Sequence, residues 1–167
     1  DETDPAFASP SKPVGVFYSA EQAELLRQKE FELREDAGRG FRRVVPSPFP
    51  VSIVEAPVIR QLIDSGVIVV AAGGGGIPVV EREGRLCGVE AVVDKDHAST
   101  LLGELLDADH MLILTGVSCA YRNFGTDQQE PIRQATPEEA ETLIREGHFA
   151  PGSMRPKVCL LYTSPSP

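Results

Sequence analysis

The stretch Val67-Ile-Val-Val-Ala-Ala-Gly-Gly-Gly-Gly-Ile-Pro78 decides the fold that we expect for this chain. It begins with an unbroken apolar run, Val67–Ala72, and the glycines Gly73–Gly76 follow at once. A short apolar run that is bounded by helices is typical of a strand buried on both faces, as the strands of parallel sheets are. We therefore predict a buried strand over Val67–Ala72 that ends in a glycine loop.

Helices and strands alternate on both sides of this stretch. Ile53–Ser65 carries apolar side chains on one face at helical spacing, and Gly66 can end that helix in the left-handed conformation. We predict a further helix over Asp96–Leu106 and a second buried strand over Met111–Leu114. The alternation favours an α/β fold with a mostly parallel sheet and helices on both faces. Ligands of such sheets bind beyond the carboxyl ends of the strands.

Local signals outside this central region are also clear. Capping-box spacing marks two helix starts, one at Ser19 with Gln22 and one at Thr136 with Glu139. Pro78–Val89 has the pattern of a β-hairpin that turns at an internal Glu-Gly pair. These signals predict the start or the turn of an element and leave its tertiary partners open.

Composition and charge restrict the possible functions. The chain has 167 residues, a hydrophobic content of 41% and a net charge of −9, which fits one soluble domain. An acidic chain repels nucleic acid and anionic membrane surfaces, and the longest apolar run is far shorter than the ~20 residues of a membrane span. Three scattered cysteines lack the spacing of a zinc site or a disulfide framework. We expect a cytoplasmic protein that binds neither nucleic acid nor membranes.

Three features could form a ligand site, and each also has a structural explanation. Backbone N–H groups of Gly73–Gly76 could approach an oxyanion, or the glycines could only provide a turn. The charged run Asp94-Lys95-Asp96 is usually a solvated helix cap, although a lysine held between carboxylates also suits a phosphoryl group. Arg39, Arg42 and Arg43 form either a solvated loop or an anion clamp. The residues alone leave these alternatives open.

Five motifs occur in a fixed order along the chain. They are Ser11-Lys-Pro-Val-Gly15, Glu35-Asp-Ala-Gly-Arg-Gly-Phe-Arg-Arg-Val-Val-Pro-Ser-Pro48, Gly73-Gly-Gly-Gly-Ile-Pro-Val-Val80, Gly88-Val-Glu-Ala-Val-Val-Asp-Lys-Asp96 and Phe149-Ala-Pro-Gly-Ser-Met154. Together they resemble the carbamate kinase family of the amino acid kinase superfamily, from about Asp4 to Val158. The resemblance implies a three-layer αβα sandwich and a homodimer when full length. It also implies reversible phosphoryl transfer between carbamoyl phosphate and ADP, giving ATP and carbamate with Mg²⁺, in arginine breakdown by the deiminase route.

The resemblance gives roles to residues that are uninformative by themselves. Lys12 matches a lid lysine that reaches the transferred group, Lys95 matches a lysine on the nucleotide phosphates, and Lys157 matches a third lysine on the phosphoryl group. Asp96 matches a carboxylate that orients these lysines and helps to hold the metal. The residues expected to border the nucleotide or its phosphates are Gly73, Gly74, Gly75, Gly76, Thr115, Gly116, Val117, Tyr121, Ser153 and Met154.

The resemblance also implies a division of the chain. Residues 1–41 match a protruding lid subdomain, and residues 42–158 match the nucleotide-binding half of the kinase domain. Residues 159–167 resemble translated sequencing-adapter DNA and are expected to be an artefactual tail; a natural variant tail is the alternative. The family's N-terminal half, with its Gly-Gly-Asn turn and His-Gly-Asn-Gly-Pro loop, has no match here, so we expect the chain alone to be inactive. Two other hypotheses are an amino acid or UMP kinase relative, which the lid motifs disfavour, and a non-catalytic fragment.

Overall fold

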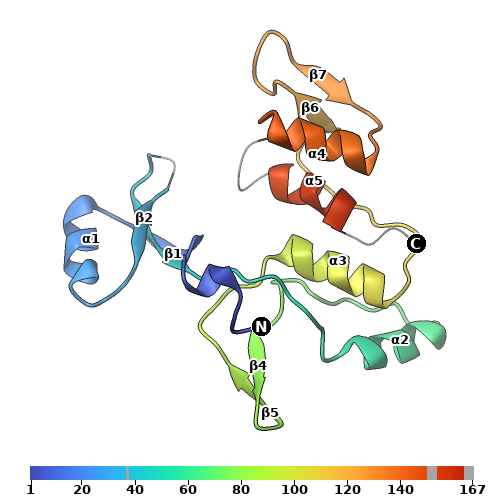
Figure 1. Ribbon diagram of the computed structural model, residues 1–167, viewed down its shortest axis with the longest axis horizontal. Coiled ribbons are helices and arrows are strands. Elements are labelled where there is room, and N and C mark those ends of the chain that lie inside the picture. The colour runs from blue at the N-terminus through green and yellow to red at the C-terminus, as the bar shows by residue number, and fades with distance from the viewer. Residues whose placement is uncertain (37, 150–153, 164–167) are drawn as a thin grey trace. The chain divides into compact units, whose positions relative to one another are not determined.

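The computed structural model describes residues 1–36, 38–149 and 154–163, the last four of these as backbone only (Figure 1). The chain divides into two compact units. The first unit contains Asp1–Ile53 and Val70–Ala98, and the second contains Val54–Val69 and Ser99–Pro167. Each unit is described by itself below.

The first unit is built from short antiparallel ladders. Its elements are the 3-10 helix η1 (Pro5–Phe7), β1 (Lys12–Tyr18), α1 (Ala20–Arg27), β2 (Leu33–Glu35), β3 (Phe41–Val45), β4 (Val79–Arg82), β5 (Arg85–Gly88) and the start of α3 (Lys95–Leu105). Strands β1, β3 and β2 pair in that order in one sheet, and β4 pairs with β5 in another. Lys12 lies opposite Val45, and the register between β1 and β3 shifts between Val14 and Tyr18.

Two of the local predictions in this unit are confirmed. Ser19 accepts a hydrogen bond from the Gln22 N–H, and the Gln22 side chain accepts one from the Ser19 N–H, so the capping box forms. The β4–β5 hairpin turns at Glu83 and Gly84, with φ of 53° and 72°. Positive φ at both central residues matches the twist of a two-residue hairpin, which is why a Glu-Gly pair is acceptable there.

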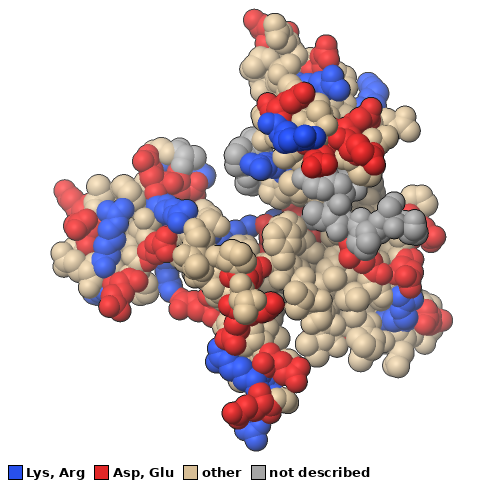
Figure 2. Space-filling view, viewed as in Figure 1, with Lys and Arg blue, Asp and Glu red and all other residues tan. Residues whose placement is uncertain are grey.

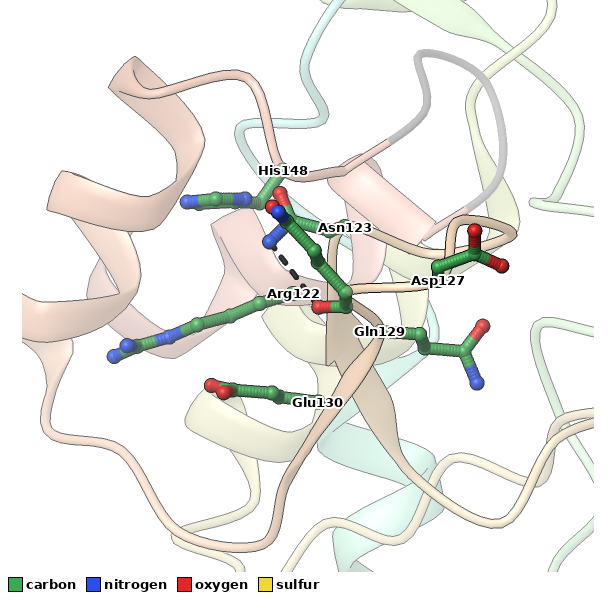
Figure 3. A pocket seen from close by; sticks show the side chains of 7 residues that line it. Arg122, Asn123, Asp127, Gln129, Glu130 and His148 are labelled. Carbon is green, nitrogen blue, oxygen red and sulfur yellow. Dashed lines mark hydrogen bonds between the residues drawn. The ribbon is translucent and has the colours of Figure 1, made fainter.

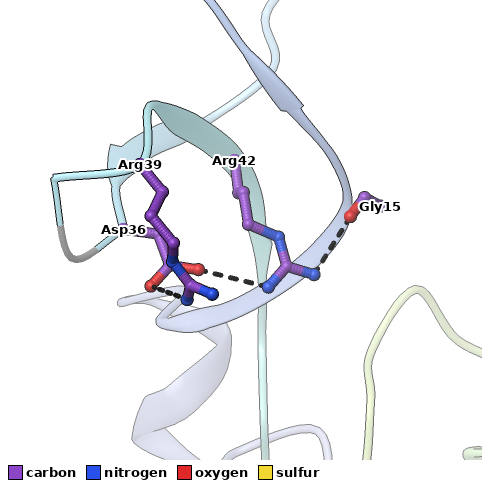
Figure 4. Close-up of polar contacts among 4 residues, drawn as sticks. All are labelled: Gly15, Asp36, Arg39 and Arg42. Atoms are coloured by element: carbon purple, nitrogen blue, oxygen red, sulfur yellow. Dashed lines mark hydrogen bonds and ion pairs between the residues drawn. The ribbon is translucent and has the colours of Figure 1, made fainter.

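One carboxylate and two arginines hold the sheet of β1, β3 and β2 where β1 changes register (Figure 4). The Asp36 carboxylate accepts from Arg42 at 3.2 Å and from Arg39 at 3.5 Å. Arg42 also donates to the Gly15 carbonyl at 3.0 Å, and both guanidinium groups lie over the ring of Phe17. Because these charges already meet a carboxylate, the geometry favours a structural role over an anion clamp. Arg43 likewise pairs with Glu90.

Arg42→Ala is expected to destabilise the chain by about 1–3 kcal/mol, because it removes a charged hydrogen bond and a contact to Gly15 from a side chain that is only 23% exposed. Arg39→Ala is the matched control, since Arg39 is 63% exposed and makes one long ion pair, which is worth about 0–1 kcal/mol. Urea denaturation of both variants measures the difference. Equal losses in the two variants would show that the Gly15 contact contributes nothing.

The second unit contains α2 (Ala56–Asp64), the end of α3, β6 (Ala120–Arg122), β7 (Glu130–Ile132), α4 (Pro137–Arg145) and α5 (Met154–Thr163). The predicted capping box of Thr136 and Glu139 forms at the start of α4. The core of the second unit is formed by buried side chains from α4, the following loop and α5, namely Ala140, Leu143, Phe149 and Val158. Residues 159–163, which belong to the predicted tail, continue α5, whereas residues 164–167 lie outside the described part of the chain. The origin of this tail stays a prediction.

The two predicted buried strands are wrong for the described chain. Val67–Ala72 and Met111–Leu114 form no strand, and their side chains reach exposures of 94% at Ile68, 96% at Val70 and 86% at Leu114. The ladders among the described residues are all antiparallel. A strand is stable in a sheet only when a neighbour pairs with its N–H and C=O groups, and no described residue provides that neighbour for either segment.

Charged side chains of both signs occur close together at the surface. On the face shown in Figure 2, the described Lys and Arg side chains lie interspersed with Asp and Glu rather than gathered into one basic surface. This distribution agrees with the net charge of −9. In the part of the chain that the structure describes, no helix is both long enough and apolar enough to cross a membrane.

Candidate functional site at the start of α3

The glycine loop packs directly against the segment that leads into α3. A Cβ atom added to Gly75 would lie 2.1 Å from the carbonyl oxygen of Val93 and 3.4 Å from the backbone nitrogen of Lys95. Gly75 also has a φ of +96°, which L side chains rarely adopt. Added Cβ atoms at Gly73, Gly74 and Gly76 would meet nothing within 4 Å. Packing therefore requires glycine at Gly75, at the point where the loop touches the helix start.

Asp94 joins this helix start to the strand that carries Lys12. One carboxylate oxygen, Oδ1, accepts from the Asp96 N–H at 2.8 Å, and the Ala98 N–H donates to the Asp94 carbonyl at 3.0 Å, so Asp94 caps α3. The other oxygen, Oδ2, forms an ion pair with Nζ of Lys12, 82 positions earlier in the chain. We call Lys12, Gly75, Asp94, Lys95 and Asp96 the α3-start cluster.

Burial and charge act on two titratable groups at the α3-start cluster. Partial burial raises the pKa of Asp94, but hydrogen bonds from Lys12 and the Asp96 N–H outweigh burial, so the net pKa lies below its usual range. His97 stacks on Phe49 with ring centroids 4.2 Å apart. Burial lowers the pKa of His97, and the carboxylates of Asp94 and Asp96 only partly oppose that effect.

Acidification is expected to destabilise the first unit in two steps. The pKa of His97 is lower in the folded chain than in the unfolded chain. The stability that neutral His97 contributes is therefore fully present above about pH 6.5 and is lost as the pH falls through the folded pKa. The pKa of Asp94 is also lowered in the folded chain. The stability that its carboxylate contributes is therefore lost at lower pH, below about pH 4. His97→Phe keeps a ring against Phe49 and removes the first step. The free energy of unfolding, measured between pH 7 and pH 5, tests this loss of stability. If it depends on pH in the variant as it does in the original chain, the assignment of the first step to His97 is contradicted.

The predicted site residues are divided between the two units, and some of those in the first unit lie together. In the first unit it brings Lys12, Gly75, Lys95 and Asp96 to one helix start, although Lys12 and Asp96 are far apart in sequence. Lys95 is exposed at the first position of α3. Asp94 was predicted only as part of the charged run before the helix, because a carboxylate at that place is normally a cap and its lysine partner lies on a distant strand.

The other predicted residues belong to the second unit. The Thr115 hydroxyl donates to the Val117 carbonyl at 2.8 Å, and the hydroxyls of Ser118 and Tyr121 lie 2.9 Å apart. Met154 packs against the core of that unit, and Lys157 lies half-buried on α5. Ser153 lies outside the described residues, and Gly116 is exposed. That these residues meet the α3-start cluster stays a prediction.

A cavity of about 450 Å³ opens beside the β6–β7 hairpin of the second unit (Figure 3). Its lining includes the Arg122 guanidinium and the carboxylates of Asp127 and Glu130, so charges of both signs are present. Asn123 donates to the Gln128 carbonyl at 3.3 Å across the loop. The residues predicted to bind the nucleotide do not line this cavity in the described chain. No sequence motif marks its loop, so sequence reasoning did not find it.

The carboxylates of the described residues do not form a dedicated metal centre. No group of three or more His, Cys, Asp or Glu side chains able to hold a metal is found among them. Mg²⁺ in phosphoryl-transfer sites usually takes one or two carboxylates and completes its shell with phosphates and water. Asp96 provides a carboxylate of that kind in the first turn of α3. The donor chemistry therefore fits Mg²⁺ bound together with a nucleotide.

Comparison with known proteins places the chain in a family. Residues 16–160 match the amino acid kinase family, and the chain belongs to that family. Within it, the chain is similar to the carbamate kinase of Clostridium perfringens, with 54% identity over 95% of this chain and 51% of that protein. It is also similar to the carbamate kinase of Pyrococcus horikoshii, with 52% identity over the same shares.

Solved structures show the same relationship in three dimensions. A protein of Aeropyrum pernix K1 matches with a TM-score of 0.88 and 50% identity, over 98% of this chain and 53% of that one. Carbamate kinase from Giardia lamblia bound to AMP-PNP matches with a TM-score of 0.84 and 44% identity, again over 98% and 53%. The predicted amino acid kinase-like α/β fold, incomplete in this chain, is confirmed. The chain spans about half the length of the relatives it matches, which agrees with the two apolar segments that lack strand partners.

Proposed function

We propose that this chain carries the nucleotide-binding half of a carbamate kinase, which transfers a phosphoryl group between carbamoyl phosphate and ADP to give ATP and carbamate. The observation that carries the proposal is the α3-start cluster, where Lys12 and Lys95 come from distant segments to one helix start beside a glycine loop. The similarity to carbamate kinases over 95% of the chain supports this particular reaction.

The chemistry of the cluster suits phosphoryl transfer, which needs positioning and charge neutralisation more than covalent catalysis. The exposed ammonium of Lys95 stands at the N-terminus of an eleven-residue helix, where free N–H groups and the helix dipole favour anions. Lys12 adds a second positive charge from the lid. Lys157 is proposed as the third lysine on the phosphoryl group. Gly73–Gly76 would donate backbone N–H groups to phosphate oxygens.

The nucleotide and the metal belong to the same proposal. The Giardia carbamate kinase is bound to AMP-PNP, which supports an adenine nucleotide as ligand here. Thr115–Val117, Tyr121, Ser153 and Met154 are proposed to border that nucleotide. When bound, Mg²⁺ would be held by Asp96 and would neutralise phosphate charge. The complete protein is proposed to be a cytoplasmic homodimer that acts in arginine breakdown, a proposal that the family resemblance supports.

A panel of acceptors tests the reaction class. We define the two-chain assembly as this chain combined with the part of the Clostridium perfringens carbamate kinase that has no counterpart in it. ATP consumption by this assembly is expected with carbamate and not with glutamate, aspartate or UMP. Turnover with one of the latter and none with carbamate would assign the chain to another branch of the amino acid kinase family.

The chain alone is expected to show negligible kinase activity. About half of the length of its relatives has no counterpart here, so groups that complete the phosphate and carbamate sites are missing. A coupled ATP assay on the purified 167-residue chain measures this. Lys95→Ala gives the blank for contaminating kinases. Turnover that exceeds this blank would show that the chain contains a complete active site.

A further inference from the structure

We propose that Asp94 is a positioning residue for phosphoryl transfer, because its carboxylate ties the side chain of Lys12 to the first turn of α3. This inference rests on the proposed function, since it names a residue that acts through the lid lysine of that site. The two carboxylate oxygens of Asp94 make different contacts. Oδ1 accepts a hydrogen bond from the Asp96 N–H and so caps α3, and Oδ2 pairs with the Lys12 ammonium. One side chain therefore connects two segments that are 82 residues apart.

The backbones on both sides of this ion pair are already held by other contacts. The Ser11 N–H donates to the Val45 carbonyl at 3.2 Å, next to Lys12. The Val92 N–H donates to the Pro46 carbonyl at 2.9 Å, next in sequence to Val45. The last residue of β3 and the proline that follows it thus hold the start of β1 and the segment that leads into α3. The carboxylate of Asp94 is therefore needed to aim the Lys12 side chain rather than to bring the two backbones together.

Aiming matters because a lysine side chain is long and flexible. The side chain has several rotatable bonds, so an unpaired ammonium samples many positions. Transfer of a phosphoryl group is sensitive to small misplacement of the charges around it. The ion pair is partly buried on both sides, so solvent screens it less than a surface pair. Asp94 holds the ammonium beside the helix start and does not itself touch the phosphoryl group.

Lysine labelling on the 167-residue chain tests the positioning step without any activity. The variant is Asp94→Asn, which keeps an oxygen that can cap α3 and removes the negative charge. Competitive acylation of amines is expected to modify Lys12 about three- to tenfold faster in this variant, because the amine is no longer held in a partly buried ion pair, with exposed Lys29 as the internal reference. Glu2→Gln is the matched control, since it removes a carboxylate that pairs with Arg82 in the same unit. An unchanged Lys12 rate in Asp94→Asn would overturn the proposal.

Kinetics of the two-chain assembly test whether the positioning matters for catalysis. Asp94→Asn is expected to lower kcat about tenfold and to leave the KM for ADP within about twofold, because Asp94 does not bind the nucleotide. Asp94→Glu is expected to restore part of kcat. The double variant Lys12→Ala, Asp94→Asn is expected to be no slower than Lys12→Ala alone, since Asp94 acts through Lys12.

The two readouts separate the possible failures. Losses that multiply in the double variant would show that Asp94 acts independently of Lys12, which would overturn the proposal. A loss confined to the KM for ADP would do the same, because it would place Asp94 in nucleotide binding. If the unmodified assembly transfers no phosphoryl group, the proposed function fails, and the labelling experiment still decides whether Asp94 holds Lys12.

Discussion

Lys95→Ala is expected to lower the rate of phosphoryl transfer by the two-chain assembly about 10²- to 10³-fold, the loss typical of removing one group that stabilises developing charge. Lys95 is the first residue of α3, exposed, and its backbone lies beside the glycine loop. Its ammonium is the charge that the proposed site directs at the nucleotide phosphates. The measurement is kcat for ATP formation from carbamoyl phosphate and ADP.

The fold of this variant is expected to persist, because an exposed side chain at a helix start contributes little to the core. Far-UV circular dichroism and the urea midpoint check this. Lys29→Ala, an exposed lysine that follows α1, is the matched control and is expected to keep full activity. A Lys95→Ala variant as active as this control would remove Lys95 from the site.

Gly75→Ala is expected to destabilise the chain by about 2–5 kcal/mol, because it combines a strained φ with overpacking. The added Cβ atom would lie 2.1 Å from the Val93 carbonyl oxygen, so either the loop or the start of α3 must move. That movement would also displace Asp94 and Lys95, and transfer by the two-chain assembly is expected to be lost. Urea denaturation and the coupled assay measure the two effects.

Gly74→Ala provides a control within the same loop. An added Cβ atom at Gly74 meets nothing within 4 Å, and its φ is not in the left-handed region. It is expected to cost less than about 1 kcal/mol, the ordinary effect of a surface substitution. Equal destabilisation by the two substitutions would contradict the close packing of Gly75 against the helix start.

The sequence predicted elements well where the signal was local. The capping boxes at Ser19 and Thr136 and the Glu-Gly turn of the β4–β5 hairpin depend on residues within a few positions of one another, and all three form. The buried strands over Val67–Ala72 and Met111–Leu114 do not form. An apolar run can predict that a segment needs to be buried, but it carries no information on whether a pairing strand is present.

The site was predictable to a smaller extent. From the residues alone, the glycine loop and Asp94-Lys95-Asp96 were ambiguous between a cap and a phosphate site, and Lys12 was an ordinary loop lysine. The family resemblance predicted the roles of Lys12 and Lys95, and the structure adds Asp94, which pairs with Lys12 and caps the helix that begins at Lys95. That connection depends on a contact across 82 positions, which no local pattern encodes.

The central claim is that this chain supplies the nucleotide half of a carbamate kinase, and ³¹P NMR of the two-chain assembly tests it most directly. With carbamoyl phosphate, ADP and Mg²⁺, the carbamoyl phosphate signal is expected to decline while the γ-phosphate signal of ATP grows in equal amount. The Lys95→Ala assembly is expected to show neither change beyond the spontaneous decay of carbamoyl phosphate. Decay of carbamoyl phosphate to inorganic phosphate alone, without ATP, in a folded assembly would contradict the account.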